Sequence, residues 1–301
     1  MIHDFHVFWE AARVVLEGLS PYTVSGYIST PLLAWCFIPF GLLSWKVACW
    51  AWYAANASWL LLWCSRDRRV LNWKTLCFVP LIVLMIVGQV DLLVMLLGLW
   101  AAPAALGLLV FLKPQLGLVL ILWRWLQWSK EQRWKNLATV VGTASLVWLA
   151  IGALHPGWVG EWRAAAPAVE TYASGSASVW GLGKWALPAI IVTAPLALLL
   201  FRRTGAFFWS AFALINPITN AYSLITLLPY LDWWAVGLSW AAMIMALVLH
   251  TGAVFVIVPL YLLWKEAVKA MKVPEAIIPN KNGRIWGGGY GDDKWAEGEV
   301  R

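Results

Sequence analysis

The sequence consists of long apolar runs separated by short clusters of basic residues. An α-helix needs about 20 mostly apolar residues to cross the hydrocarbon core of a bilayer, and several runs approach that length. Apolar residues make up 62% of the 301 residues and charged residues only 12%, whereas soluble domains carry about 25% charged residues. A soluble chain of this composition could not cover itself with polar surface. We therefore expect an integral membrane protein that crosses the lipid bilayer many times.

The order of apolar residues decides between the two kinds of structure that can cross a bilayer. Only helices and closed barrels satisfy their backbone hydrogen bonds in lipid. Barrel strands alternate apolar and polar residues, whereas the runs in this chain are continuous. The sequence therefore predicts an all-α, polytopic transmembrane protein with about 9–11 membrane segments. Short bent hairpins and external amphipathic helices are part of this expectation. We place the chain in a cell membrane, as a multi-pass protein of the bacterial inner membrane.

Four basic clusters indicate how the chain is oriented. They lie at residues 66–74, 124–135, 202–203 and 265–272. Cytoplasmic loops carry an excess of Lys and Arg, so an even number of crossings separates each cluster from the next if all four are cytoplasmic. Residues 75–88 then cross the bilayer from the cytoplasmic to the external side, and residues 89–102 cross it back. Residues 104–128 and 206–230 must each form two short limbs in the same way.

The two predicted pairs of limbs both contain a proline. We expect them to bend at Lys113-Pro114 and at Asn216-Pro217, because proline removes a helix hydrogen bond and disfavours helix in the residue before it. Non-helical backbone at membrane depth must face protein or a water-filled cavity. Both bends are therefore candidates for lining a functional site near the external side.

We divide the chain into five parts. These are an external amphipathic helix and loop (1–30), an N-terminal transmembrane module (31–154), an external loop with an amphipathic helix (155–184), C-terminal transmembrane helices (185–264) and a disordered cytoplasmic tail (265–301). The first helix is expected from Asp4 to Gly18, where apolar residues recur at three- and four-residue spacing. Residues 31–64 are too long for one straight crossing, and we expect a break at Pro39 and Gly41.

Ionisable residues at membrane depth are candidates for function. Lys113 follows an apolar stretch and precedes a proline. A point-charge ammonium at a helix break suits an anionic lipid phosphate, although a lysine can also extend to the interface without further role. Gln89 and Asp91 lie in Gly-Gln-Val-Asp between two apolar runs. They could bind sugar hydroxyls, or they could simply form a polar turn.

Two acidic residues outside the apolar runs have simpler explanations. Asp4 begins the external amphipathic helix. It could be a helix cap or a general base at the mouth of an active site, and the residue alone favours the cap. Asp232 follows Pro-Tyr-Leu and is expected to be a loop residue. His3 and His6 flank Asp4 as metal ligands would, but polar residues often cluster near a terminus, and we expect no metal.

Several functional classes lose support from the sequence. It contains no P-loop, no GxGxxG motif before a helix, no GxSxG and no HExxH, which are the signatures of nucleotide-fuelled transport and of common soluble-enzyme chemistry. The net charge of +7 does not indicate a nucleic-acid partner, because the basic residues cluster between the apolar runs. We expect no cofactor.

Several motifs occur together in an order that resembles glycosyltransferase family 87. The stretch with Asp4-Phe5, Trp9, Ala11-Ala12, Gly18 and Pro21-Tyr22 resembles that family's D-F-x-x-Y-x-A-A … G-x-x-P-Y element. Gly88 to Asp91 resembles G-Q-x-N, and Lys113-Pro114-Gln115 resembles K-P-x-P. Asn216-Pro217 with Tyr222 and Leu227-Leu228-Pro229 resembles S-P-x-S-W-x-H-Y … L-L-P, and Ser176 to Ser178 with Gly181 resembles its loop before a late helix.

The resemblance implies a GT-C fold and a membrane enzyme. Such enzymes transfer a sugar, often mannose, with inversion from a polyprenyl-phosphate donor to a lipid-linked or envelope glycan, on the external face. Asp4 would then be the catalytic base, and Lys113 would bind the donor phosphate. The sugar and acceptor pocket would contain Gln89, Asp91, Gln115, Asn216 and Tyr222. The polyprenyl-phosphate sugar and the glycan or glycolipid acceptor are substrates, and no metal or cofactor is implied.

The chain departs from the family pattern at several positions. Asp91 stands where the family has Asn, Leu116 follows Gln115 in place of the proline, and Tyr222 stands where His is common. Family members have a crossing before the acidic loop, whereas Asp4 is the fourth residue here, so we expect a late start codon or an incomplete gene model. A lipid or solute transporter or flippase is the alternative, because broken helices at mid-depth are typical of transporters.

Overall fold

The computed structural model describes residues 3–165, 205–216 and 220–272, and every regular element in these ranges is a helix. The α-helices are α1 (His3–Leu16), α2 (Pro31–Cys36), α3 (Ile38–Gly41), α4 (Trp45–Arg66), α5 (Trp73–Leu76), α6 (Val79–Val87), α7 (Asp91–Trp100), α8 (Pro103–Leu112), α9 (Pro114–Gln127), α10 (Lys130–Leu154), α11 (Trp158–Ala165), α14 (Gly205–Ile215), α15 (Trp233–Leu249) and α16 (Ile257–Lys272). Three 3₁₀ helices join them: η1 (Pro21–Thr23), η3 (Ala221–Tyr230) and η4 (Gly252–Val256). The all-α prediction is confirmed for this part of the chain.

The predicted N-terminal amphipathic helix is present as α1. It buries Phe5 and Ala12 completely and exposes Glu10. The ring of Phe5 stacks on that of Trp52 in α4, with 5.2 Å between ring centroids. Gly18 has a φ of +78°, which ends the helical stretch, because glycine adopts this left-handed region without steric cost. The apolar face of α1 therefore packs on the protein itself.

The break predicted at Pro39 and Gly41 is confirmed at Gly41, where α3 ends, but not at Pro39. Pro39 is in the first turn of α3, where a proline costs no hydrogen bond because the first amides of a helix have no partner within the helix. Phe37 is a turn residue between α2 and α3, and residues 42–44 separate α3 from α4. Only α4, with 22 residues, is long in this stretch. Pro39 therefore begins a helix and does not break one.

The first predicted out-and-return pair corresponds to α6 and α7. These helices meet at an angle of 113°. Gly88 ends α6 with a φ of 81°, and the indole Nε1 of Trp52 donates a hydrogen bond of 3.1 Å to the Gly88 carbonyl. The left-handed glycine turns the chain, and the buried indole holds the turn in place. Gln89 and Val90 form the connection.

The second predicted pair corresponds to α8 and α9. Lys113 ends one helix and precedes the other, with φ −153° and ψ 87°. A Cβ atom at Gly117 would lie 2.6 Å from the backbone of Leu109, and one at Gly107 would lie 2.7 Å from the Val140 carbonyl oxygen on α10. Glycine at these two positions lets α8 approach both neighbours closely, as small residues do between membrane helices. The break predicted at Lys113-Pro114 is confirmed.

The third predicted pair is described only in part. Helix α14 ends at Ile215, and η3 begins at Ala221, while Pro217 lies outside the described residues. Residues 166–184 of the predicted external loop and residues 185–204 of the predicted C-terminal transmembrane helices also lie outside them. The amphipathic helix expected in the external loop corresponds to α11 as far as it is described.

The predicted boundary at residue 265 falls inside α16, which continues to Lys272. Lys265 forms an ion pair of 2.5 Å with Asp232, and Lys269 forms one of 2.6 Å with Glu266. These pairs support the helix beyond the apolar run. Asp232 is more than a loop residue, because it also caps α15 by accepting a hydrogen bond of 2.8 Å from the amide of Ala235. The boundary expected at residue 265 was wrong, because α16 runs past it. The pairing of Asp232 with Lys265 was not foreseen, because it depends on the fold.

The number of predicted membrane segments is not confirmed by helix length and composition. Among the described residues, α10 alone is long and apolar enough to span a bilayer, with a mean hydropathy of 2.0, and a second span results if the bent α6–α7 pair is counted as one. Helices α8, α14, η3 and α15 are apolar but have 10–17 residues. The proline and glycine breaks divide the long apolar runs of the sequence into these shorter pieces.

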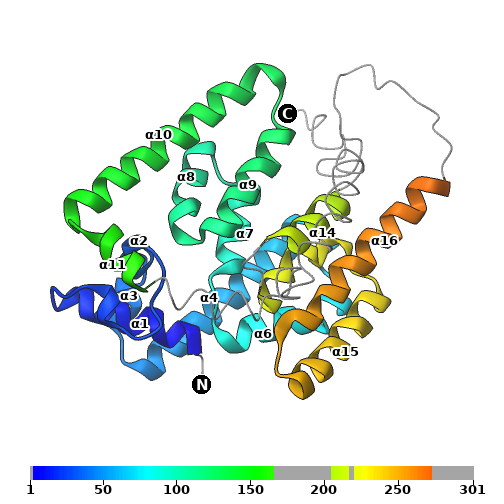
Figure 1. Cartoon of the computed structure of the whole chain (residues 1–301), viewed down its shortest axis with the longest axis horizontal. Coiled ribbons are helices and arrows are strands. Elements are labelled where there is room, and N and C mark those ends of the chain that lie inside the picture. The colour runs from blue at the N-terminus through cyan, green and yellow to red at the C-terminus, as the bar shows by residue number, and fades with distance from the viewer. Residues whose placement is uncertain (1–2, 166–204, 217–219, 273–301) are drawn as a thin grey trace, which may run out of the picture.

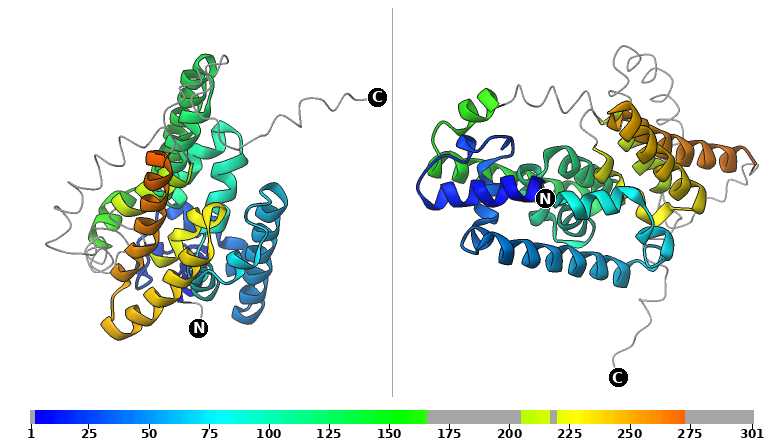
Figure 2. Two further views of the ribbon diagram at one scale, coloured as in Figure 1. Left: turned by 90° about the vertical axis from the view of Figure 1, so that its right-hand side faces the viewer. Right: turned by 90° about the horizontal axis from the view of Figure 1, so that it is seen from below.

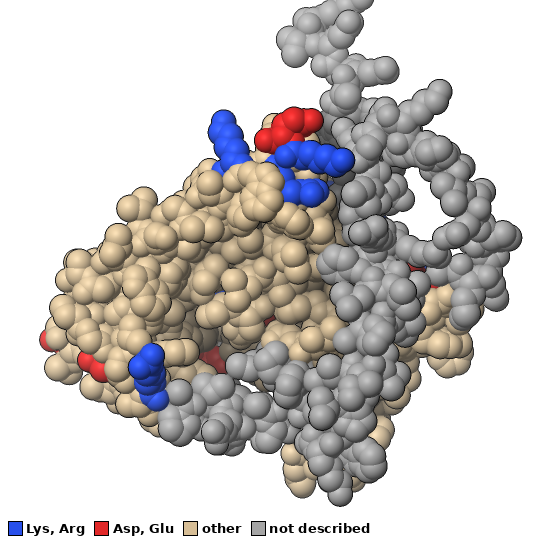
Figure 3. Space-filling model, turned by 45° about the horizontal axis from the view of Figure 1, so that its top comes forward, with Lys and Arg blue, Asp and Glu red and all other residues tan. Residues whose placement is uncertain are grey.

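Large apolar side chains nevertheless cover much of the surface of the described part. On α10 they include Val141, Leu146 and Leu149, and on α15 they include Trp234, Ile244 and Val248. Figure 3 shows charged side chains along the upper and lower edges of one face, with few of them in the broad zone between. Exposed apolar area on this scale marks contact with lipid or with another protein.

The helices are arranged so that several breaks lie together. In Figure 1, α8 and α9 lie beside the long helix α10, while α14, α15 and α16 form the opposite side of the molecule. Seen from below in the right-hand view of Figure 2, α1 runs from the left side to the centre, and its N-terminal end lies beside the cyan segment that contains α6. The lower end of α10 leads into α11, next to α2. The cavity described below is at this lower end.

Candidate active site

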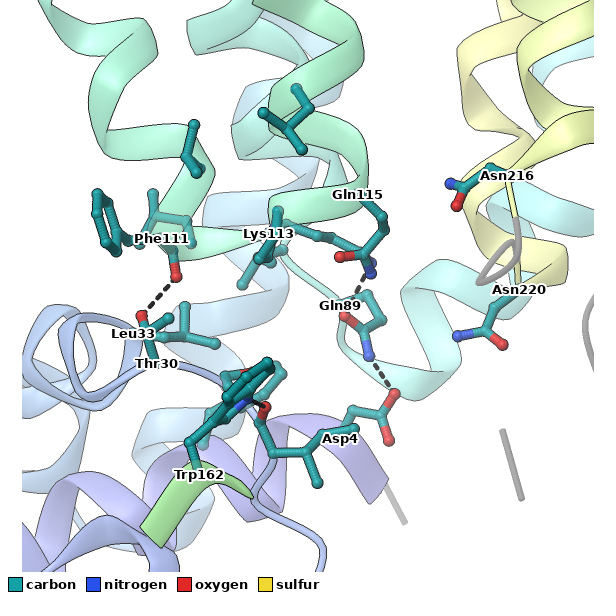
Figure 4. A pocket seen from close by; sticks show the side chains of 18 of the residues that line it. Asp4, Thr30, Leu33, Gln89, Phe111, Lys113, Gln115, Trp162, Asn216 and Asn220 are labelled. Atoms are coloured by element: carbon teal, nitrogen blue, oxygen red, sulfur yellow. Dashed lines mark hydrogen bonds between the residues drawn. The ribbon is translucent and has the colours of Figure 1, made fainter. Parts of the chain in front are cut away.

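A cavity of about 1040 Å³ lies where the breaks come together. Six of the seven predicted site residues line it: Asp4, Gln89, Lys113, Gln115, Asn216 and Tyr222. They come from α1, the α6–α7 connection, the α8–α9 junction, the end of α14 and η3. Residues that are far apart in the sequence thus share one space (Figure 4). The roles assigned to them remain predictions.

The centre of the site is a chain of polar contacts. The side-chain amide of Gln89 donates from Nε2 to the carboxylate of Asp4. Its Oε1 accepts a hydrogen bond of 3.4 Å from the ammonium of Lys113. Asp4 and Lys113 are therefore linked through a single amide, as Figure 4 shows for Gln89 and Asp4.

Asp91 lies beneath Lys113 and not on the cavity wall. Its side chain is 0% exposed, and its Oδ2 atom accepts a hydrogen bond from the Lys113 ammonium. Its Oδ1 atom accepts one of 3.0 Å from the hydroxyl of Ser223. A buried carboxylate that is fully engaged in this way holds the ammonium in place. Asp91 is thus the one predicted pocket residue that the structure does not place on the cavity surface.

Another wall of the cavity is formed by η3 and the end of α14. The Lys113 ammonium lies 4.7 Å from the centroid of the Tyr222 ring, at a distance where a cation is attracted to the ring face. The side-chain amide of Asn220 donates to the hydroxyl of Tyr222. Asn216 and Asn220 lie across the space from Thr30 and Trp162 in Figure 4. This wall offers amide groups that can both donate and accept hydrogen bonds.

Apolar and aromatic side chains form most of the remaining wall. They include Phe8, Phe111, Trp148, Trp158 and Trp162. Sites for organic ligands are commonly lined in this way, with a few polar groups that fix orientation. The arrangement could hold a molecule with one polar and one apolar part.

Helix α11 is fastened over the cavity by polar contacts. The carboxylate of Glu161 accepts a hydrogen bond from the Ser20 hydroxyl and lies 2.9 Å from Nε2 of His155. The indole of Trp162 donates to the Ile28 carbonyl at 3.0 Å. The hydrogen bonds from Ser20 and His155 lower the pKa of Glu161. Burial raises the pKa of the nearby Tyr22 hydroxyl.

Three residues of the site went unnoticed in the sequence. Asn220 and Ser223 follow the predicted Asn216-Pro217 bend, and Trp162 belongs to the predicted external loop with an amphipathic helix (155–184). The signal available for the first two was their closeness to Tyr222. A polar residue within a mostly apolar stretch such as 220–231 could have been examined on the same grounds as Lys113.

The described residues contain no group of three or more His, Cys, Asp or Glu side chains placed to hold an ion. In His6, one of the two histidines beside Asp4, the Nδ1 atom lies 3.7 Å from Oε2 of Glu10 on the exposed side of α1. The Lys113 ammonium is a cationic group that lines the cavity.

Two curated proteins share a short stretch with this chain. GPI mannosyltransferase 1 of Eremothecium gossypii is 50% identical to it over 42 residues, and GPI mannosyltransferase 1 of Saccharomyces cerevisiae is 45% identical over 42 residues. The stretch makes up 14% of this chain and only 11% and 10% of the two proteins. No protein-family model matches the chain. No solved structure matches it. The likeness is therefore local, and it covers too little of either protein to show the family of this chain.

Proposed function

We propose that this chain is a membrane-embedded, inverting glycosyltransferase. It transfers a sugar from a polyprenyl-phosphate donor to a lipid-linked or envelope glycan acceptor on the external face of a cell membrane. The sugar that we propose is mannose. The resemblance to glycosyltransferase family 87, with its GT-C fold, and the short likeness to two mannosyltransferases support this reaction. The observation that carries the proposal is the convergence of a carboxylate and an ammonium on one cavity.

The geometry fits the chemical needs of sugar transfer. The Asp4 carboxylate takes the proton from an acceptor hydroxyl, and that oxygen attacks the anomeric carbon of the sugar. The bond between the anomeric carbon and the phosphate oxygen breaks, and the electron pair leaves with the polyprenyl phosphate. Lys113 stabilises the charge that develops on this leaving group. Attack on the side opposite the phosphate inverts the anomeric centre.

The polar and apolar parts of the cavity suit the two parts of such a substrate. Gln115, Asn216, Asn220 and Tyr222 present groups for sugar hydroxyls. The apolar lining offers a place for a lipid chain, since burial of apolar surface is favourable in proportion to its area. In this assignment Asp91 supports Lys113 from below and does not touch the sugar.

The basic residues support the proposed orientation. Arg124, near the end of α9, donates hydrogen bonds of 3.1 Å and 2.8 Å to the carbonyls of Gly98 and Leu99 at the end of α7. This is the end of each helix remote from Lys113 and Asp91, which lie at their beginnings. Because basic residues favour the cytoplasmic side, this arrangement supports our proposal that the cavity faces the external side.

The reaction can be tested with the purified chain in liposomes that contain a radiolabelled polyprenyl-phosphate mannose and extracted bacterial glycolipids. We expect the wild type to label the acceptor fraction, and Asp4→Ala to lower the rate by about 10²-fold or more. Glu17→Gln, which removes a carboxylate from the exposed end of the same region, serves as the matched control and should keep the wild-type rate. Wild-type transfer by Asp4→Ala would disprove the assignment of Asp4.

A transporter or flippase is the second candidate, and the 113° bend between α6 and α7 favours it. Broken helices that face a central site are typical of transporters. The same liposomes distinguish the two functions. A transporter would move the labelled donor across the bilayer without forming a new glycosidic bond, whereas the enzyme would produce a labelled acceptor.

A further inference from the structure

Gln89 lies between two charged groups, and both ends of its side-chain amide are already hydrogen-bonded to them. Little of the amide is left to bind a sugar. Its side chain is 7% exposed. The amide nitrogen donates to Asp4 and the amide oxygen accepts from Lys113. An ionised carboxylate accepts hydrogen bonds but donates none, and an ammonium only donates. The two neighbours therefore fix which end of the amide faces which charge.

The backbone that carries Gln89 is also held firmly. Gly88 adopts the left-handed conformation, and the indole of Trp52, which is 1% exposed, donates to its carbonyl. Asp91 begins α7 two residues later and binds Lys113 from the other side. A side chain anchored in this way keeps its position when a ligand enters, which is what a positioning group requires.

We propose that Gln89 is a positioning residue that sets the Asp4 carboxylate and the Lys113 ammonium in register, and that it is not a sugar ligand. This inference rests on the proposed glycosyl transfer. The base must face the acceptor hydroxyl while the ammonium faces the leaving phosphate, and both contacts have to form in one transition state. One amide bonded to both groups fixes their separation before the substrates arrive.

The proposal makes a specific prediction about the kinetic constants. A group that only positions the base and the ammonium acts on the chemical step, so its loss lowers kcat. Loss of a sugar ligand instead raises the KM for the donor. The split between kcat and KM therefore reports on the role of the amide.

Gln89→Glu and Gln89→Met test the inference. Glutamate has the shape of glutamine but puts a second carboxylate against Asp4, and methionine removes both hydrogen bonds. We expect kcat per folded protein to fall by about tenfold or more in both variants, and by a larger factor than the KM for the donor changes. Gln132→Glu adds the same charge on the exposed N-terminal turn of α10 and should keep the wild-type kcat and KM.

The outcomes separate this inference from the function on which it rests. A higher KM for the donor sugar with an unchanged kcat would make Gln89 a sugar ligand and overturn the proposal. The paired variants guard against loss of folding, because either one that retains transfer gives both kinetic constants. Absence of sugar transfer by the wild type would overturn the proposed function and this inference together. Transfer by the wild type with an unchanged kcat in both variants would overturn the inference alone.

Discussion

At the scale of single residues, the site depends on one buried ion pair. Lys113 is 6% exposed and Asp91 is 0% exposed. Charges removed from water in this way are tolerated only when they are paired and hydrogen-bonded. Ser223 satisfies the second oxygen of Asp91, and the Tyr222 ring lies beside the ammonium. The pair therefore holds Lys113 in place. It also lowers the free-energy cost of burying the ammonium of Lys113.

Asp91→Leu should destabilise the protein because it leaves the Lys113 ammonium buried without its charged partner. We expect a loss of about 3 kcal/mol in the free energy of unfolding. The double variant Asp91→Leu/Lys113→Met should recover most of it, because an apolar pair of similar size carries no desolvation penalty. Thermal unfolding in detergent, followed by tryptophan fluorescence, measures both. Equal destabilisation by the single and the double variant would contradict this account.

The sequence predicted the break at Lys113 but not the partner of Lys113. A Lys-Pro pair within an apolar run is a local signal, and the helix ends there as expected. The pairing of Lys113 with Asp91 depends on how α7, α8 and α9 pack, which no local pattern encodes. Asp91 was therefore expected in the sugar pocket, although its carboxylate lies beneath the ammonium. Asp232 was misread for the same reason, because Lys265 is distant in the sequence.

At the scale of elements, close packing of α8 on its neighbours places Lys113. A side chain at Gly107 would meet the backbone of α10, at the Val140 carbonyl oxygen and the Ala144 amide nitrogen. Backbone atoms cannot move aside as the end of a flexible side chain can. The position of the α8–α9 junction, and with it the ammonium of Lys113, therefore depends on a glycine that has no chemical role.

Gly107→Ala should push α8 away from α10 and lower stability by about 1–3 kcal/mol. Gly142→Ala is the matched control, because no atom lies within 4 Å of a Cβ atom built there. In a helix that change should be neutral or stabilising by up to about 1 kcal/mol. Melting temperatures in the same detergent compare the two variants. Equal stability of both would show that the α8–α10 contact is looser than described.

The lengths of the helices were harder to predict than the positions of the bends between them. The apolar runs predicted about 9–11 crossings, whereas the described helices are mostly too short to cross a bilayer alone. Hydropathy is averaged over a window of residues. The average therefore hides a single glycine or proline that ends one helix and starts another within the same apolar run. Pro39 illustrates the limit, since the same residue that can break a helix can also begin one.

At the scale of the whole molecule, segments far apart in the sequence close the cavity. Ser20 follows α1 and Glu161 lies in α11, and their hydrogen bond joins the start of the chain to its middle. His155, at the end of α10, completes the contact. This contact attaches α11, which carries Trp158 and Trp162, to the loop that forms the other side of the cavity mouth.

The contact between Glu161 and Ser20 should make part of the stability depend on pH. Because the pKa of Glu161 is lowered in the folded protein, its contribution is present at neutral pH and is lost as the pH falls below about 4.5. We expect Glu161→Gln to cost about 0.2–1 kcal/mol at pH 7, since the carboxylate is partly exposed. Melting temperatures measured from pH 7 to pH 3.5 should converge for wild type and variant.

Glu17→Gln is the charge-matched control for this experiment and should follow the wild type across the pH range. A difference between wild type and Glu161→Gln that persists unchanged at pH 3.5 would show that ionisation of Glu161 does not matter. The expected sign follows from the direction of the pKa shift, because the unfolded chain binds a proton at higher pH than the folded chain does.

The link between Asp4 and Gln89 has a consequence for biosynthesis. Asp4 leaves the ribosome early, whereas Lys113, Tyr222 and Ser223 are made much later. The polar network that joins them forms only after the helices in between have been inserted and packed. A partly synthesised chain therefore exposes the carboxylate of Asp4 without the amide and the ammonium that organise it. In the proposed enzyme, catalytic competence arises late in synthesis, when nearly all of the described fold is present.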